Sequence, residues 1–80
     1  MSTRICTISI IIENREEVAP QVNNLLSSYG DNIVARLGIP LKHRGIFVIN
    51  VVIEGTTDEI GALTGQLGQI PGLQIKSITV

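Results

Sequence analysis

The side chains best suited to chemistry form two polar clusters, at residues 13–17 and at residues 42–44. The cluster at residues 42–44 is basic. Lys42, His43 and Arg44 could contact a phosphate, an acidic partner or, through His43, a metal. No Cys, His or carboxylate stands near His43 at the spacing of a metal site. We therefore expect a solvated turn and no metal ligand, with a site shared between subunits as the remaining alternative for His43.

The first cluster covers residues 13–17 and combines three carboxylates with Asn14 and Arg15. Asn14 and Glu17 have the spacing of a capping box, which predicts the start of a helix. Free backbone N–H groups at such a start suit the carboxylate of a ligand. Glu16 and Glu17 would repel an anion, however, so a capped helix with solvated charges is the favoured interpretation of this cluster.

Catalysis finds little support in these residues. Cys6 lies within an apolar stretch, which indicates a buried structural thiol rather than a reactive one. The sequence shows no Ser/His/Asp set, no paired-carboxylate motif and no Walker-type phosphate loop. We therefore expect a protein that is not an enzyme and that needs no cofactor.

Composition limits the remaining classes of function. The chain has 80 residues, of which 44% are hydrophobic, with seven acidic and six basic side chains. Residues 1–80 are expected to form one domain, and the balanced charge argues against direct binding to nucleic acid. A lone cysteine, no signal-peptide pattern and no apolar run of membrane-spanning length predict a cytoplasmic protein.

Two apolar strands must position these clusters. Residues 45–54 (GIFVINVVIE) are apolar on both alternating faces, as are residues 4–13. A strand covered on both sides has this continuous apolar pattern, and the β-branched residues favour strand over helix. Both segments are therefore predicted to be central strands.

Two amphipathic helices follow these strands. The first carries its apolar stripe at positions 18, 22, 25, 26 and 29, with Pro20 expected to kink it or delay its start and Gly30 to end it in the left-handed conformation. The second begins with a capping box formed by Thr56 and Glu59 and ends at Pro71. Gly61, Gly65 and Gly68 near one face of this helix predict close packing against a neighbouring element, or, alternatively, a ligand pocket at a subunit interface.

The remaining segments complete an α+β fold. Residues 31–39 alternate like a half-buried edge strand, residues 40–44 form a turn, and residues 73–80 form a last strand. The order strand, helix, strand, strand, helix, strand predicts a ferredoxin-like βαββαβ sandwich. Right-handed crossovers give an antiparallel sheet in the order 4-1-3-2, with both helices on one face.

Such a sheet leaves its second face uncovered. Ile46, Val48 and Val52 would lie there, beside either Ile5 and Ile11 or the alternating set Cys6, Ile8, Ile10 and Ile12. A large apolar patch is unusual on a monomer. We therefore expect a homo-oligomer, a dimer or tetramer, that associates through sheet faces or edges, with Ile46, Val48 and Val52 in the interface.

The chain also resembles known families. The segment ENREEVAPQVNNLLSSYGDNI resembles the opening of an ACT domain, with Asn14-Arg15 at the turn and Gly30, Asn32 and Ile33 before the second strand. The segments RLGIP, RGIFVINVVIEG and ALTGQLGQIPGLQIKS are similar to a family of proposed iron-only hydrogenase system regulators. That family has an ACT-like fold, which is also akin to the C-terminal domain of the nickel-responsive regulator.

The resemblance implies a regulatory module. In ACT domains the corresponding turn and the start of the second strand line an effector site at a subunit interface, often for an amino acid. Carried over, the contacts would be Asn14, Arg15, Asn32 and Ile33. Many ACT domains continue with Pro-Gly where this chain has Glu16-Glu17, and the His and Cys ligands of the nickel-responsive regulator have no counterpart here.

We therefore expect a non-enzymatic, effector-sensing regulatory module that acts as an oligomer, in an iron-only hydrogenase system or a related redox system. The alternative is a protein–protein assembly module with no small-molecule ligand. A DNA-binding regulator is disfavoured, because the charge is balanced and no recognition-helix segment is apparent.

Overall fold

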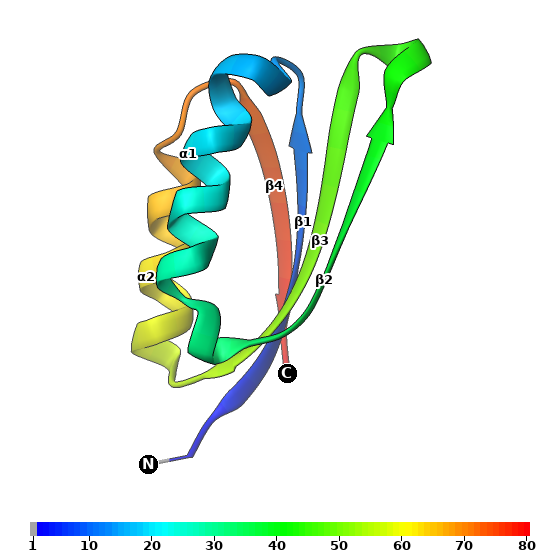
Figure 1. The fold of residues 1–80 in the computed structure, drawn as a ribbon. Helices are drawn as coiled ribbons and strands as arrows, with labels where there is room; N and C mark the ends of the chain where they lie inside the picture. The colour runs from blue at the N-terminus through cyan, green and yellow to red at the C-terminus, as the bar shows by residue number, and fades with distance from the viewer. Residues whose placement is uncertain (1) are drawn as a thin grey trace.

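A computed structural model describes residues 2–80 and shows a four-stranded antiparallel sheet with two helices packed on one face (Figure 1). The sheet order is β2-β3-β1-β4, so the predicted ferredoxin-like order is confirmed. The elements are β1 (Arg4–Ile12), α1 (Arg15–Ser28), β2 (Ile33–Leu41), β3 (Ile46–Gly55), α2 (Thr57–Gly68) and β4 (Leu73–Thr79). Short 3-10 turns, η1 (Gly30–Asn32) and η2 (Lys42–Arg44), precede β2 and β3.

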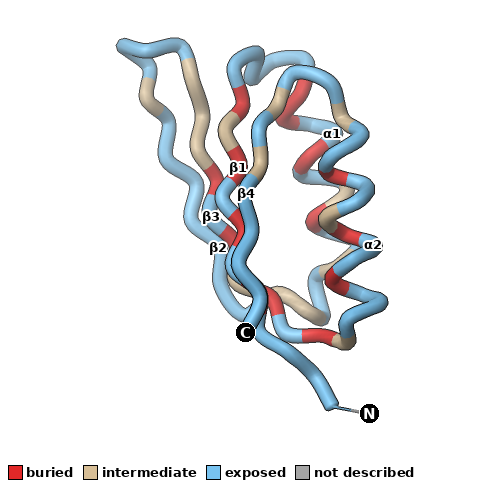
Figure 2. The backbone as a smooth tube through the Cα atoms, turned by 180° about the vertical axis from the view of Figure 1, so that it is seen from behind, coloured by how far each residue is buried: buried red, intermediate tan, exposed pale blue. Residues whose placement is uncertain are grey.

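The core lies between the helices and the two central strands, as the red segments of the backbone show (Figure 2). Alternate residues of β1 and β3 point toward the helices, whose apolar stripes cover them. The buried residues are Cys6, Ile8, Ile10, Ile12, Val18, Ala19, Val22, Leu26, Ile49, Val51, Ile53, Ile60, Leu63 and Leu67. Because Cys6 is fully buried among them, the predicted structural role of its thiol fits this position.

The register resolves which row of β1 faces away from the helices. Ile10 pairs with the buried Ile49, whereas Ile11 pairs with Val48 on the other face. Ile5 and Ile11 therefore accompany Val48 on the open face, and the row containing Cys6 forms the core. The sequence left open which of these two rows of β1 lies on the open face, and the register of β1 with β3 decides it.

The first helix corrects three expectations. Asn14 precedes α1 but makes no side-chain cap hydrogen bond, so the expected capping box with Glu17 does not form. The helix starts at Arg15 and continues through Pro20 without interruption, so its start is not delayed. Gly30 is not left-handed, since the backbone leaves α1 through the 3-10 turn η1 and only Gly45 and Gly72 have positive φ in the described chain.

The edge strand β2 differs from its predicted bounds and orientation. It runs to Leu41 and includes Pro40, a residue that sheets tolerate at an edge, so the turn is confined to η2. A register shift between Ile33 and Ala35 changes the phase of the strand. Ile33 packs against the core, whereas Leu37 is 59% exposed on the open side, so the expected half-buried row is wrong for this chain.

The second helix begins as predicted and contradicts the expectation for its glycines. Thr56 and Glu59 form a complete capping box. A Cβ added to Gly61, Gly65 or Gly68 would meet no atom within 4 Å outside the helix backbone, so no neighbouring element of the chain requires these glycines. The predicted close packing is therefore wrong within one copy.

These glycines generate a first prediction. Gly61→Ala and Gly65→Ala should each stabilise the fold by about 0.5–1 kcal/mol, because alanine loses less backbone entropy in a helix and open space receives its Cβ. Denaturant unfolding measures this gain. Unchanged or lower stability would show that the space beside α2 is occupied, for example by a second copy.

Candidate functional site

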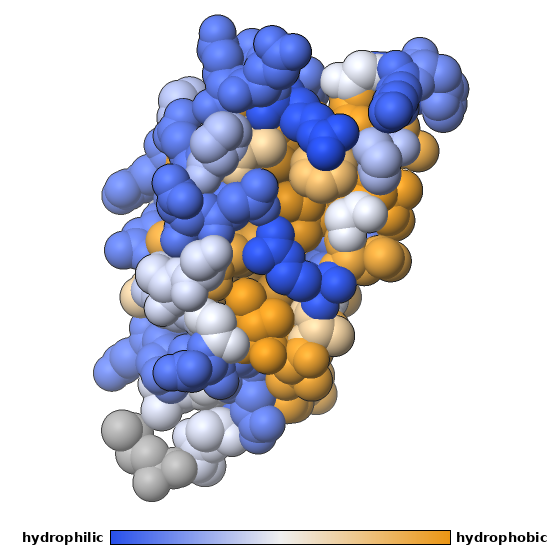
Figure 3. All heavy atoms as spheres, in the orientation of Figure 1, coloured by the Kyte–Doolittle hydropathy of each residue, from blue (hydrophilic) through white to orange (hydrophobic). Residues whose placement is uncertain are grey.

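The open face of the sheet presents a row of side chains from β3 that is apolar over most of its length. The row consists of Ile46, Val48, Asn50, Val52 and Glu54. The residues of β2 that pair with the first four of them are, in the same order, Leu41, Ile39, Leu37 and Ala35. Leu37 is 59% and Ile39 37% exposed. Hydrophobic side chains gather over β2 and β3 on the side away from the helices (Figure 3). The expected residues Ile46, Val48 and Val52 therefore lie together on the uncovered face.

The other half of this face, over β1 and β4, is mixed. On β1, Thr7 and Ser9 alternate with Ile5 and Ile11, and the neighbouring residues of β4 are Ile78, Lys76 and Gln74. The Ser9 hydroxyl donates to Asn50 Oδ1 at 2.6 Å. A shallow depression of about 100 Å³ opens here, lined by Ser9, Ile11, Gln74, Ile75 and Lys76. The face thus divides into a mostly apolar half over β2–β3 and a mixed half over β1–β4.

The β1–α1 turn places Arg15 against the only phenylalanine. The Arg15 guanidinium carbon lies 4.3 Å from the centroid of the Phe47 ring, a cation–π arrangement. Phe47 lies against β2 at Gly38, where an added Cβ would be 3.0 Å from the ring carbon Cζ. Glycine at position 38 therefore leaves room for the ring beside the edge strand.

Asn32 is held at the N-terminus of α2. Its Nδ2 donates to the Glu54 carbonyl oxygen at 3.2 Å and to Glu59 Oε2 at 3.3 Å. Gly55 leaves room for this contact, since an added Cβ there would be 3.0 Å from Glu59 Oε1 and 3.1 Å from Asn32 Nδ2. The Asn32 amide thus ties the start of β2 to the start of α2.

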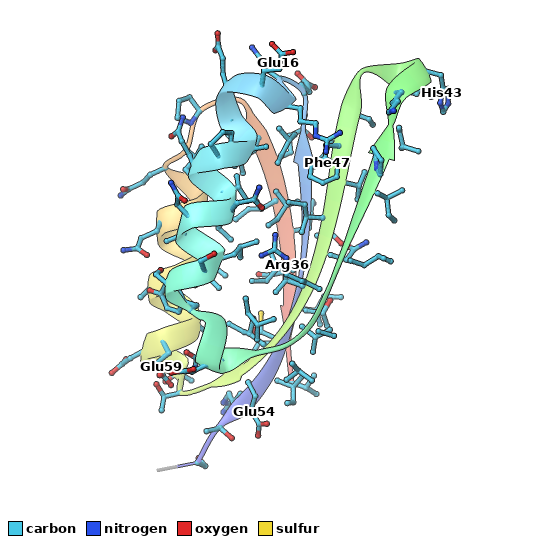
Figure 4. The ribbon with its side chains drawn as sticks, in the orientation of Figure 1. Glu16, Arg36, His43, Phe47, Glu54 and Glu59 are labelled. Atoms are coloured by element: carbon cyan, nitrogen blue, oxygen red, sulfur yellow. The ribbon has the colours of Figure 1, made fainter. Side chains whose placement is uncertain are left out.

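The four residues expected around an effector fall into two separate groups. Asn14 and Arg15 begin α1, beside Phe47, whereas Asn32 and Ile33 follow its last turn, near Glu54 and Glu59. Figure 4 shows Phe47 and Glu54 at opposite ends of the molecule. A helix of 14 residues is about 21 Å long, so one copy does not bring the two groups together.

Arg36 and Phe47 make further contacts between elements. Arg36 of β2 reaches α1, where its Nη2 donates to Asn23 Oδ1 at 2.8 Å (Figure 4). Sequence reasoning missed both Arg36 and Phe47, because β2 and β3 were described only by their apolar rows. A signal existed for Arg36, a charged residue within an alternating strand. None marked Phe47 as the partner of Arg15.

The remaining candidate cluster lies at the tip of a hairpin. Lys42, His43 and Arg44 form the turn η2 at the tip of the β2–β3 hairpin. Residues 2–80 contain no group of three or more His, Cys, Asp or Glu side chains that could hold a metal ion. No helix in that same range is long and apolar enough to cross a membrane.

Comparison with known proteins places the chain in a family. Residues 4–77 match the model of the TM1266-like family of proposed iron-only hydrogenase system regulators. The chain belongs to this family. No curated protein sequence matches it.

Solved structures agree with the family match. The protein TM1266 from Thermotoga maritima is 35% identical, with a TM-score of 0.93 and 99% of each chain covered. The ACT domain of the GTP pyrophosphokinase from Chlorobium tepidum is 22% identical, with a TM-score of 0.76 over 92% of this chain and 96% of that one. The second likeness shows the fold alone, and it confirms the predicted ACT-like architecture.

The contacts of Glu59 generate a prediction on pH. The Thr56 backbone N–H donates to Glu59 Oε1 at 2.8 Å, and with the Asn32 amide it holds the pKa of Glu59 below its usual value. A lowered folded-state pKa stabilises the fold above the unfolded-state pKa, and this contribution is lost as pH falls through the folded-state pKa. Glu59→Gln should therefore reduce the loss of stability on acidification.

The measurement is the urea midpoint between about pH 3 and pH 7, since model carboxyl groups titrate in this range. Glu16→Gln on α1 is the matched control, because it removes the same charge from an exposed side chain on the other helix. If the urea midpoint changed equally with pH in the wild type and in Glu59→Gln, the lowered pKa of Glu59 would be contradicted.

Proposed function

We propose that this protein is a non-enzymatic regulatory module that works as an oligomer and changes its assembly when an effector binds. Membership of a family of proposed hydrogenase-system regulators supports the regulatory role. The iron-only hydrogenase system, or a related redox system, is the proposed setting. Regulation would then follow from coupling between effector binding and subunit packing.

The observation that carries this proposal is the uncovered face of the sheet, whose β2–β3 half is mostly apolar. A face of four strands, about 19 Å wide and 30 Å long, offers on the order of 600 Å² per copy. Two copies would bury about 1,200 Å², which is the lower limit for specific, stable interfaces. Burial at roughly 25 cal/mol per Å² of apolar surface gives a small fold reason to associate.

The proposed effector contacts are Asn14, Arg15, Asn32 and Ile33, which form two groups, one at each end of α1 on the helix side of the copy. Stacking on Phe47 fixes the Arg15 guanidinium and leaves its N–H edges for a carboxylate. Glu16 and Glu17 follow Arg15 directly and suit the ammonium group of an amino acid. A zwitterionic amino acid therefore fits this mixed charge better than a simple anion.

An assembly module without a small-molecule ligand is the second candidate. The bonds of Asn32 favour it, because its amide nitrogen already donates to two oxygens of the same chain. A ligand at Asn32 would compete with those bonds. In this candidate, the open face binds a second copy and the polar ends of α1 only maintain the fold.

Thermal unfolding against the twenty amino acids, nucleotides and divalent metals separates the two candidates. A ligand at 100 times its dissociation constant adds about 2.7 kcal/mol and raises the melting temperature by several degrees. The shift should disappear in Arg15→Ala or Asn32→Ala and persist in Arg36→Ala, a matched control that keeps Arg15 in place. No shift across the panel would favour the assembly module.

The contact face has its own test. Val48→Glu places a charge in the centre of the apolar half and should produce a monomer in light scattering at micromolar concentration. Gln74→Glu adds the same charge to the edge strand β4, at the far side of this face, and should affect assembly less. A wild-type monomer would refute the oligomer, and an unchanged mass for Val48→Glu would exclude this face as the contact.

A further inference from the structure

The residues of β3 on the open face are arranged symmetrically about Asn50. Val48 and Val52 lie two residues away on either side, and Ile46 and Glu54 lie four residues away. Four residues of strand span about 13 Å, so the two ends of the row are equidistant from its centre. A row with this symmetry can pack on a copy of itself when the second copy runs in the opposite direction.

We propose that two copies pack their open faces together about a two-fold axis near Asn50, with their β3 strands antiparallel and the basic turn η2 of each copy on Glu54 of the other. The proposal rests on the oligomer proposed above and defines its partner and orientation. Val48 of one copy then faces Val52 of the other, and Ile46 faces Glu54 at each end of the row. The β2–β3 half of each copy covers the β2–β3 half of the other.

Charge complementarity selects this orientation. η2 carries Lys42, His43 and Arg44 at one end of the β2–β3 hairpin, and Glu54 ends the open row of β3 at the other. The hairpin tip leans away from the helices, toward the open side, in both backbone views (Figures 1 and 2). A copy lying on the open face in the antiparallel direction therefore brings an acidic group to the overhanging basic tip.

A parallel arrangement is less favourable for either position of its two-fold axis. An axis along the β2–β3 hairpin would bring the basic turn of one copy to the basic turn of the other, and like charges in contact are unfavourable. An axis along the middle of the sheet would instead place β2 across β4, so that the mostly apolar half of one face covered the mixed half of the other. In the antiparallel arrangement Lys76 lies on the edge strand β4, where a long side chain can extend its ammonium group into water.

Association through the β2 edge is less suited to this chain. β2 contains Pro40 and the register shift between Ile33 and Ala35, and both features are typical of edges that resist pairing with another strand. Its exposed Leu37 and Ile39 point to the open face, not along the direction of the ladder. The face therefore offers more contact to a second copy than this edge does.

A charge-reversal experiment tests the orientation. In Glu54→Lys each basic turn meets a basic residue, and in the double variant Lys42→Glu/Arg44→Glu each acidic turn meets Glu54. Each variant alone should raise the dimer dissociation constant about tenfold or more at low ionic strength, because like charges are juxtaposed twice per dimer. An equimolar mixture should form a heterodimer with affinity near the wild-type value, because both contacts again join opposite charges.

Sedimentation equilibrium gives the masses and constants, and circular dichroism checks that each variant is folded. Asn24→Lys, which adds a basic side chain to the exposed face of α1, should leave the dimer unchanged. If Glu54→Lys dimerises as tightly as the wild type while Val48→Glu is monomeric, the face is correct and the antiparallel orientation is wrong. A monomeric wild type, or a dimeric Val48→Glu, overturns the proposed oligomer itself.

Discussion

The structure depends on a mismatch between two central strands that are apolar on both faces and two helices that cover only one. β1 and β3 pair in the middle of the sheet and direct Ile8, Ile10, Ile49 and Val51 into a dry core. The same pairing directs Ile11 and Val48 to the opposite side, which no element among residues 2–80 covers. The helices complete the core of the chain and leave the burial of the second face to an outside surface.

The contacts around the helix ends show how the chain fixes its polar parts. α2 starts with a reciprocal cap between Thr56 and Glu59, and Asn32 adds a third group from the start of β2. α1 has no such side-chain cap, and its first residue, Arg15, instead stacks on Phe47. One helix start is thus closed by its own hydrogen bonds, whereas the other presents a guanidinium on a ring.

The topology could be predicted from sequence because the strand and helix periods are strong and the two central strands have a distinct apolar pattern. The phase of β2 could not, because the register shift after Ile33 is a local backbone event that no residue type marks. The prediction for the end of α1 was wrong for a related reason. Gly30 could adopt a left-handed cap, but the chain continues there in a 3-10 turn. Side-chain partners such as Arg15 and Phe47 depend on three-dimensional proximity across 32 positions of sequence, which periodicity does not report.

The position of Phe47 links the two sides of the sheet. Its ring contacts Arg15 on the helix side, while its chain neighbours Ile46 and Val48 lie on the open side. One peptide unit therefore separates the ring that supports the guanidinium from the apolar row, so a movement of the backbone at Phe47 would reach both. Thermodynamic linkage makes this relation reciprocal. A molecule that bound at Arg15 more tightly in paired chains than in single chains would strengthen pairing, and pairing would strengthen its binding by the same factor.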